Sequence, residues 1–417
     1  MSDTPDLVAL SETLRSTLPA EALSFTPEPA YNIDGLAPAL IAIPATRQDV
    51  AAVLAAAGGA GASVLPRGGG TQTDFGMPPR RNDVALDLHR LDRLVEYEPA
   101  DLTVTVEAGM RLVELQRLLG EHGQWLPLDP PLPDEATIGG VLATNASGPS
   151  RLRYGSARDL VIGMTTALAS GDLVKSGGRV VKNVAGYDLA KLQIGALGTL
   201  GVIVQAAFKV APLPVRDALV AVSGDLEALS KLAGAVVEAR LALLGLVLSK
   251  RASESHWTLT ARFAGGAAAV ERSQHETAAL AQAASLSTGE SAMADWRATQ
   301  MLRHKAPLVA RCSVSPAAVP DFAAALSQVG ATVFAYPGVG TLYGAWDTVP
   351  ADKSLSNLRN RCVAANGALV LEKTPLDLKQ RIGVWGDTRD DFALMQRLKQ
   401  QFDPGQILNP GRFLGGI

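Results

Sequence analysis

The chain has 417 residues, is 47% hydrophobic and carries a formal net charge of −3. This length predicts about two or three domains, and the near-neutral charge argues against the basic surface that nucleic-acid binding needs. The two cysteines, Cys312 and Cys362, are too few for an iron–sulfur cluster, and they favour a reducing compartment without a disulfide framework. The five histidines lack the spacings typical of metal sites, so we expect no metal on this chain.

The N-terminal sequence MSDTPDLVALSETLRSTL begins acidic and lacks the pattern of a signal peptide. No apolar run approaches the ~20 residues that span a bilayer. We therefore expect a cytoplasmic protein without a transmembrane segment. A peripheral position on the inner membrane, held through a partner, stays open.

Helix and strand signals alternate through the first half of the chain. Apolar spacing predicts a helix over 6–18, and Thr46 suits the N-cap of a second helix, which Gly58 and Gly59 would end. The proline-containing segment 211–214 predicts a domain boundary. The other expected elements of this region are helices at 48–57, 111–119 and, as a short turn, 137–145, and strands at 40–43, 63–65, 84–88 and 102–107.

The second half predicts two copies of one βαββα layout, which pair as ferredoxin-like units to form one antiparallel sheet covered by helices. The first copy has strands at 218–222, 243–248 and 257–263 and helices at 225–237 and 267–284. The second copy has strands at 308–312, 331–336 and 341–346, helices at 320–329 and 355–366, and an added strand at 368–371. A last helix is expected at 390–401.

A glycine-rich loop, PRGGGTQ, follows the strand predicted at 63–65. Successive N–H groups in such a turn form a nest for an anion such as pyrophosphate. No Gly-Lys-Ser/Thr follows, so the loop is not a Walker A motif, and the chain has no G-x-G-x-x-G between a strand and a helix. Taken alone, three glycines are more often an ordinary turn.

Two later segments also bring glycine and polar side chains together. ATIGGVLATNAS at 136–147 offers hydroxyls, an amide and an exposed backbone, although a buried helix start explains it equally. Between 177 and 203, the ligand candidates are Lys182, Asn183, Tyr187 and Asp188. An ion pair from Lys182 to Asp188 and a packed Tyr187 explain them equally well. The three segments together point to a flavin-binding enzyme subunit.

Side chains that would catalyse a reaction unaided are not evident in the sequence. It has no catalytic-triad signature, no GxSxG and no strong acid/base pair. That is typical of proteins in which a cofactor carries the reaction. The catalytic residues therefore stay unassigned.

The motifs occur in a fixed order: the glycine loop, ATIGG with TNASG, RYG, KNVAGYDL, GTLGVI and a terminal FDPGQILNPG. In this order the chain resembles flavoproteins of the vanillyl-alcohol oxidase/p-cresol methylhydroxylase (PCMH) type. The resemblance implies an α+β fold with a PCMH-type FAD-binding domain of two α/β subdomains and a cap domain of antiparallel sheet with ferredoxin-like repeats. It implies domains at 1–212 and 213–375, and a segment at 376–417 that returns to the FAD domain.

The resemblance also implies which residues bind FAD. The pyrophosphate would lie against Pro66, Arg67, Gly68, Gly69, Gly70, Thr71 and Gln72. The flavin would lie against Thr137, Gly139, Gly140, Thr144, Asn145, Ser147, Gly148 and Tyr154. Gly201, Val202 and Ile203 would hold the adenosine end.

Departures from the family pattern bear on the chemistry. Relatives that attach FAD covalently often have a histidine near the glycine loop, where this chain has Gly70 and Thr71, so we expect non-covalent FAD. The HxGDGNxH-like and EHGxG-like segments of 2-hydroxy-acid dehydrogenases are absent, and Leu197 replaces a carboxylate of the GSEGTLG pattern. The substrate-oxidising centre is therefore expected on a sister subunit.

Within the family, the chain resembles the FAD-binding subunits of bacterial glycolate oxidase (glycolate dehydrogenase), which implies an FAD-dependent oxidoreductase acting on CH–OH groups. The implied partners are a sister FAD-containing subunit, an iron–sulfur subunit and a small 2-hydroxy acid. Two alternatives stay open: a stand-alone FAD-dependent dehydrogenase for D-lactate or another 2-hydroxy acid, and a non-catalytic flavin-binding scaffold.

Overall fold

The computed structural model describes residues 5–417 except 27, 179–187, 290–292, 294–295, 298–300 and 302–303. Backbone contacts divide the chain into two compact units. The first unit comprises 1–146, 156–211 and 387–417, and the second comprises 147–155 and 212–386. The division into 1–212, 213–375 and 376–417 stays a prediction; helix α13 (Leu376–Ile382) lies in the second unit and the residues from 387 onwards in the first.

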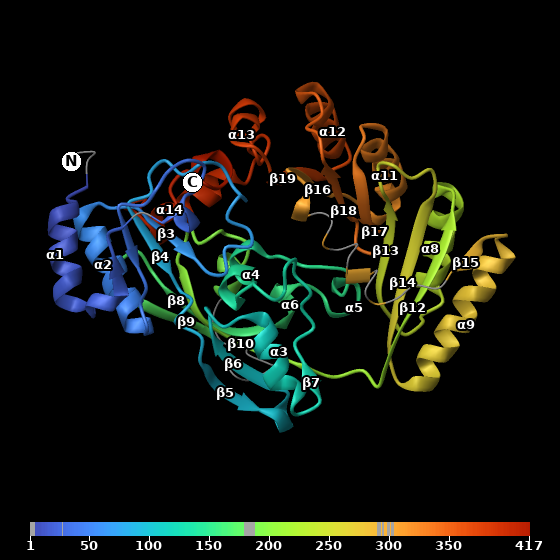
Figure 1. Cartoon of the computed structure of the whole chain (residues 1–417), viewed down its shortest axis with the longest axis horizontal. Coiled ribbons are helices and arrows are strands. Elements are labelled where there is room, and N and C mark those ends of the chain that lie inside the picture. The colour runs from blue at the N-terminus through green and yellow to red at the C-terminus, as the bar shows by residue number, and fades with distance from the viewer. Residues whose placement is uncertain are drawn as a thin grey trace. The chain divides into compact units, whose positions relative to one another are not determined.

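The first unit begins with a small sheet in the order β1-β2-β4-β3, in which β4 pairs in parallel with β2 and β3. Helices α1 (Leu7–Thr17) and α2 (Arg47–Ala60) lie side by side next to it (Figure 1) and share a buried core with its strands. The strands are β1 (Leu23–Ser24), β2 (Leu40–Ala42), β3 (Val64–Arg67) and β4 (Val84–Asp87).

Helix α2 confirms the predicted N-cap and corrects the predicted end. The Thr46 hydroxyl accepts a hydrogen bond from the Asp49 N–H at 3.1 Å, and the Asp49 carboxylate accepts one from the Thr46 N–H at 3.0 Å. The helix passes through the two glycines at 58 and 59, where we expected it to stop, and ends at Gly61. Gly61 has φ +64°, the left-handed conformation that suits glycine at a helix C-terminus.

A second sheet of the first unit is antiparallel, in the order β5-β6-β10-β8-β9. Its strands are β5 (Leu94–Glu98), β6 (Thr103–Glu107), β8 (Val161–Ala167), β9 (Leu173–Gly177) and β10 (Val202–Lys209). Helices α3 (Leu112–Gly120) and α4 (Ile138–Thr144) share a buried core with this sheet. A two-stranded ribbon pairs β7 (Gln124–Trp125) with β11 (Ala211–Pro212).

The second unit is built on an eight-stranded sheet with the order β15-β12-β14-β13-β17-β18-β16-β19. The first repeat has β12 (Arg216–Gly224), α8 (Leu226–Glu238), β13 (Leu243–Lys250), β14 (Trp257–Gly265), α9 (Ala267–Ala283) and β15 (Ser287–Gly289). The second has β16 (Leu308–Ser313), α11 (Val319–Gln328), β17 (Thr332–Tyr336), β18 (Thr341–Trp346), α12 (Asp352–Ala364) and β19 (Ala368–Lys373). The two ferredoxin-like repeats and the antiparallel cap are therefore confirmed.

Alternation along these strands explains which face of the sheet the helices cover. Leu246 and Leu248 of β13 and Leu259 of β14 face a core that contains the buried side chains of α8, α9, α11 and α12. Figure 1 shows these helices on one face of the sheet. The repeats join where β13 pairs with β17 through only three residue pairs, from Leu248↔Ala335 to Lys250↔Val333. The seam between the repeats is therefore short.

The C-terminal segment joins the first unit through backbone hydrogen bonds. After α14 (Phe392–Phe402), the Ile407 carbonyl accepts from the Val64 N–H at 2.7 Å, and the Asn409 N–H donates to the Val64 carbonyl at 3.0 Å. The last residues thus run beside β3, just before the glycine-rich loop.

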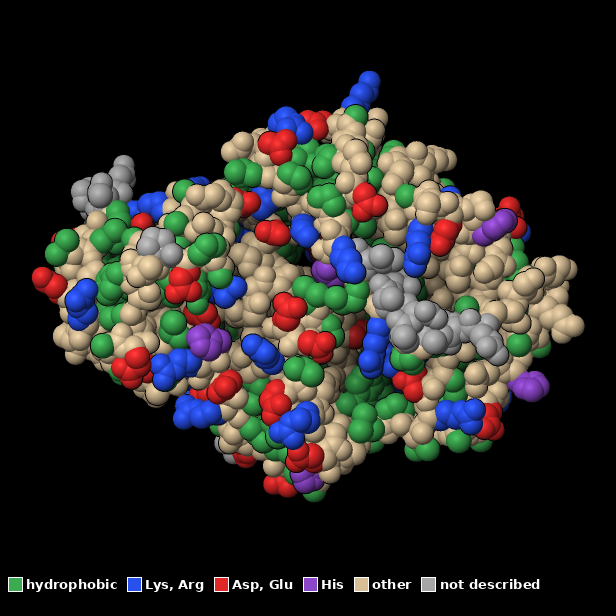
Figure 2. All heavy atoms as spheres, in the orientation of Figure 1, with side chains coloured by type: hydrophobic (Ala, Val, Ile, Leu, Met, Phe, Trp, Pro, Cys, Tyr) green, Lys and Arg blue, Asp and Glu red, His purple; other side chains and the backbone are tan. Residues whose placement is uncertain are grey.

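The remaining short elements are helices α5 (Arg151–Tyr154), α6 (Ala157–Leu160) and α7 (Ala190–Gln193), and 3-10 turns at Ala20–Ala22, Pro29–Tyr31, Pro99–Asp101, Pro316–Ala318 and Leu414–Gly416. No helix within the described ranges is both long and apolar enough to cross a membrane. Figure 2 shows positive and negative side chains interspersed on the viewed face.

Candidate cofactor-binding site

The glycine-rich loop leaves the carboxyl end of β3 and forms one wall of a cavity of about 100 Å³. Helix α4 and the C-terminal segment form the other walls. The lining residues are Ile33, Pro66, Arg67, Gly68, Gly69, Gly70, Thr71, Gln72, Thr73, Phe75, Gly140, Ala143, Thr144, Leu197, Asn409 and Arg412. Nine of these were predicted as FAD contacts from the sequence.

The loop presents backbone donors that the rest of the described chain leaves unused. The N–H groups of Gly70, Thr71 and Gln72 donate to no acceptor in the ranges that the structure describes. The Gly69 N–H donates to the Thr137 hydroxyl at 3.3 Å, which ties the loop to the start of α4. Consecutive free N–H groups beside a cavity form an anion-binding concavity.

All three glycines are required by their surroundings, and a Cβ at position 68 would lie 2.1 Å from the Thr137 hydroxyl oxygen. A Cβ at position 69 would lie 1.9 Å from the Glu135 carbonyl oxygen, so the loop touches this backbone directly. Gly70 has φ +72°, and a Cβ there would lie 2.5 Å from an Nη atom of Arg67. Any larger residue would strain the turn or displace that guanidinium.

Arg67 is held by a buried carboxylate at the end of the neighbouring strand. Its Nη1 lies 3.7 Å from Asp87 Oδ2, and its guanidinium lies over the Tyr31 ring at 4.9 Å from the centroid. Tyr31 donates its hydroxyl proton to Asp87 at 2.6 Å, and burial together with this carboxylate raises the pKa of the phenol. The cation is therefore fixed at the cavity wall.

Arg412 supplies a second cation from the other end of the chain. It is 4% exposed, and its Nη2 donates to the Thr73 carbonyl at 2.7 Å and to the Phe75 carbonyl. Burial lowers the pKa of Arg412 to about 10, while Asp34 and Asp74 oppose the shift, so the side chain is positively charged at neutral pH. A buried arginine at the cavity wall suits a bound anion, because its guanidinium can make charge-assisted hydrogen bonds to phosphate oxygens.

A buried ion pair shapes the segment that carries Arg412. The Lys399 ammonium donates to Asp403 at 2.7 Å, to the Thr199 carbonyl at 2.8 Å and to the Leu408 carbonyl at 2.9 Å. Asp403 also accepts from the N–H groups of Ile407 and Leu408. This network closes the turn after α14 and brings Asn409 and Arg412 to the cavity.

Helix α4 contributes its first and last turns. Thr144 lines the cavity, with its hydroxyl donating to the Gly140 carbonyl at 2.8 Å. Thr137 does not line the cavity but acts as the N-cap, accepting from the Gly140 N–H at 3.4 Å. Asn145 ends the helix with φ +51°, and its Oδ1 is buried without a hydrogen-bond partner in the described residues.

Other predicted contacts lie outside this cavity, and their assignment stays a prediction. A Cβ on Gly139 would meet the Ala108 side chain at 2.9 Å and one on Gly201 the Thr166 side chain at 2.4 Å, so both glycines have packing roles. Val202 and Ile203 belong to buried hydrophobic clusters. Ser147, Gly148 and Tyr154 fall in the second unit, and Lys182, Asn183 and Tyr187 lie outside the described residues.

Sequence reasoning missed seven of the cavity residues, namely Ile33, Thr73, Phe75, Ala143, Leu197, Asn409 and Arg412. The terminal Asn409-Pro410-Gly411-Arg412 reads as a turn, and only the long-range pairing of this segment with β3 brings the arginine to the loop. In the sequence, Leu197 was noted only because it replaces the carboxylate of the GSEGTLG pattern. Its side chain instead adds an apolar surface to the cavity wall.

The donor set fits a phosphate-bearing ligand. Free N–H groups, two arginines and glycines that allow close backbone approach suit a pyrophosphate. Arg67 Nε is a buried donor without a partner in the described residues, so it is available to a phosphate oxygen. The cavity is smaller than the ~300–1,000 Å³ typical of small-molecule sites, so it holds only part of a dinucleotide.

Fold and site together define a flavin-nucleotide-binding protein. Residues 38–177 match the family model described as FAD binding domain, and residues 385–413 match FAD linked oxidases, C-terminal domain. The structure is similar to that of p-cresol methylhydroxylase with substrate bound, with a TM-score of 0.76 and 16% sequence identity. The match covers 97% of this chain and 96% of that one, which shows the shared fold.

Two curated relatives extend the comparison. The chain is 26% identical over 391 residues to glycolate oxidase subunit GlcD of Bacillus subtilis, covering 84% of this chain and 83% of that one. It is 38% identical over 149 residues to glycolate oxidase subunit GlcE of Escherichia coli, covering 36% of this chain and 42% of that one. The two matched regions are similar to FAD-linked oxidases, and the fold is of the PCMH type. The chain is an FAD-dependent oxidoreductase.

Proposed function

We propose that this chain is the FAD-binding subunit of a multi-subunit glycolate oxidase (dehydrogenase) that converts glycolate to glyoxylate. A sister FAD-containing subunit and an iron–sulfur subunit would complete the complex. The broader assignment, FAD-linked oxidation of a 2-hydroxy acid, is supported by the GlcD relative, which this chain matches over most of its length. The narrower one is supported by the similarity to GlcE, a named subunit of glycolate oxidase.

One observation carries the proposal: a loop and a C-terminal segment 339 residues apart, measured from Thr73 to Arg412, meet at one anion-binding cavity. The loop N–H groups and Arg67 would bind one side of the FAD pyrophosphate, and Arg412 the other. FAD supplies two-electron redox chemistry when bound. This chain's residues bind and orient it and keep water from the diphosphate.

The FAD is proposed to be held without a covalent bond. The loop has Gly70 and Thr71 where covalently attaching relatives often have a histidine. His89 lies two residues beyond Asp87, and its Nδ1 is 3.0 Å from that carboxylate. The His89 imidazole is therefore paired with Asp87, and within the described residues it has no recorded contact with the glycine-rich loop.

The chain is proposed to depend on its partners for substrate oxidation. A 2-hydroxy acid needs a base near its hydroxyl and a cation for its carboxylate. Two arginines of the second unit are already paired with carboxylates: Arg262 with Asp217, and Arg311 with Glu372 at 2.6 Å. The histidine-rich segments of the stand-alone dehydrogenases are absent from the sequence.

A dye-reduction assay tests the proposal. The FAD-loaded chain, alone and reconstituted with its sister subunits, would be given glycolate, D-lactate or D-2-hydroxyglutarate. We expect slow turnover by the chain alone and fast turnover by the complex, with glycolate the best substrate. Equal rates with and without the partners would favour a stand-alone dehydrogenase, and a preference for another acid would refute the glycolate assignment.

A further inference from the structure

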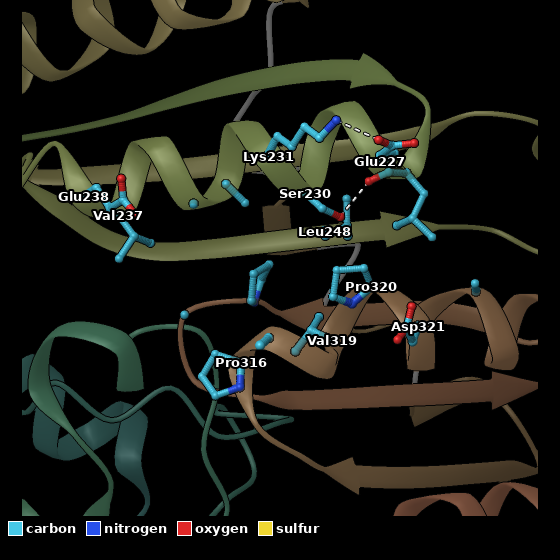
Figure 3. Close-up of a pocket in the computed structure, with 17 residues that line it drawn as sticks. Glu227, Ser230, Lys231, Val237, Glu238, Leu248, Pro316, Val319, Pro320 and Asp321 are labelled. Carbon is cyan, nitrogen blue, oxygen red and sulfur yellow. Dashed lines mark hydrogen bonds and ion pairs between the residues drawn. The ribbon is translucent and has the colours of Figure 1, made fainter. Parts of the chain in front are cut away.

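The second unit has a groove of about 710 Å³ between the first helices of its two repeats (Figure 3). One wall is formed by residues on one side of α8. The other wall is formed by the Pro316–Ala318 turn and by α11, which follows it. Leu248, on the last part of β13, lies at the seam where the repeats join. The wall residues are Glu227, Ser230, Lys231, Gly234, Val237 and Glu238 on α8, and Ala317, Pro320, Asp321 and Ala324 opposite.

Small side chains keep the middle of the groove open. On α8 these are Ser230, whose hydroxyl donates to the Leu226 carbonyl of its own helix at 2.6 Å, and Gly234. Ala317 and Ala324 line the opposite wall. Two facing helix stripes with small residues leave room for a third helix to lie between them.

Gly234 is the most informative of these residues. It lies inside α8, where glycine is less favourable than alanine. A Cβ at this position would meet nothing within 4 Å, so no contact inside this chain requires a glycine. Because position 234 has no side chain, the groove is open at this point of α8.

The rim of the groove is acidic. Glu227, Glu238 and Asp321 carry three negative charges, and the one cation among the wall residues, Lys231, already pairs with Glu227 at 2.6 Å. Val237, next to Glu238 at one end of the groove (Figure 3), is 41% exposed. The surface is therefore an apolar floor bordered by negative charge, complementary to an apolar helix face flanked by cations.

We propose that this groove binds an amphipathic helix of a sister subunit, with Lys or Arg on either side of its apolar face. The proposal rests on the proposed function, because that function requires partner chains. An acidic rim repels anionic lipid, which disfavours a membrane as the occupant. The apolar face of such a helix would pack on the apolar floor, and its flanking cations would pair with the acidic side chains of the rim.

Filling the groove tests the proposal. In Gly234→Leu the new side chain enters open space, so the fold should survive while the helix is excluded. Gly59→Leu is the matched control, because Gly59 is also an exposed glycine inside a helix with nothing within 4 Å of its Cβ. The probe is the set of sister subunits, purified together without this chain, and the readout is their Kd for the full-length FAD-loaded chain.

We expect Gly234→Leu to raise the Kd at least tenfold and Gly59→Leu to leave it unchanged. The double reversal Glu238→Lys with Asp321→Lys should also weaken binding, and less so at high salt. Unchanged affinity in both groove variants, or no binding by the wild-type chain, would overturn the proposal. So would binding to anionic vesicles, or self-association of the isolated chain, that Gly234→Leu abolishes.

The dye-reduction assay separates this inference from the proposed function. A complex that forms through the groove but does not oxidise glycolate would contradict only the function. A complex that oxidises glycolate with both groove variants fully bound would contradict only the groove.

Discussion

Replacing Gly69 should weaken FAD binding through a steric effect that can be estimated from the structure. A Cβ there would lie 1.9 Å from the Glu135 carbonyl oxygen, and ordinary contact begins at 3.4 Å, so in Gly69→Ala the two segments must separate by about 1.5 Å. Overpacking of this kind costs about 1–3 kcal/mol. The hydrogen bond from the Gly69 N–H to Thr137 is lost as well, at about 1 kcal/mol.

The same displacement moves the free N–H groups of the loop away from the ligand. Hydrogen bonds to a charged group contribute about 1.5–3 kcal/mol each. Loss of one or two of them in Gly69→Ala should raise the Kd for FAD on the order of 100-fold. Gly69→Asp should bind more weakly than its uncharged analogue Gly69→Asn, because the carboxylate repels the diphosphate, and salt should narrow that difference.

Fluorescence titration with FAD and urea unfolding of the FAD-free chain measure the two effects separately. Gly59→Ala is the control, since a methyl group there meets nothing and should stabilise α2 by roughly 0.5–1 kcal/mol with no change in FAD affinity. If Gly69→Ala binds FAD as tightly as the wild type, the loop does not contact the cofactor and the argument fails.

Three further results are expected. Acid precipitation of the FAD-loaded chain should leave the flavin in the supernatant, and flavin in the pellet would establish a covalent link. Arg412→Met should weaken FAD binding at least tenfold and lower the thermal stability, because the Thr73 and Phe75 carbonyls lose their donor. The control is Arg397→Met at an exposed position, and equal FAD affinity in the two variants would remove Arg412 from the site. Lys399→Met should destabilise the chain by about 3–5 kcal/mol in urea unfolding, because it leaves the Asp403 carboxylate buried without its cation. Adding Asp403→Asn should recover part of that stability. If the double variant is no more stable than Lys399→Met, the buried charge of Asp403 is not the cause of the loss.

Local signals predicted much of the fold. Alternation of apolar residues located the strands of both ferredoxin-like repeats, and a strand followed by three glycines located the loop at the cavity. The end of α2 was wrong because two glycines in a row looked like a stop, whereas the helix ends only where Gly61 takes a positive φ. Glycine tolerates a helix interior at a modest cost, so its identity alone does not fix a helix end.

Long-range contacts account for what the sequence did not predict at the site. Arg412 reaches the cavity because the chain around Ile407 pairs with Val64, and no local pattern encodes that pairing. Leu197 likewise lines the cavity from the turn before β10. The sequence could not show whether Gly139 and Gly201 pack against neighbouring residues or contact a ligand, because either role requires a residue without a side chain.

The most direct test of the central claim is a titration of the purified, flavin-free chain with FAD, followed by flavin fluorescence. The account predicts saturable binding of one FAD per chain, competed by ADP because the arginines and the loop bind the diphosphate. The assignment of the loop and Arg412 to the pyrophosphate would be contradicted if FAD showed no saturable binding. It would also be contradicted if ADP did not compete with FAD and riboflavin bound as tightly as FAD.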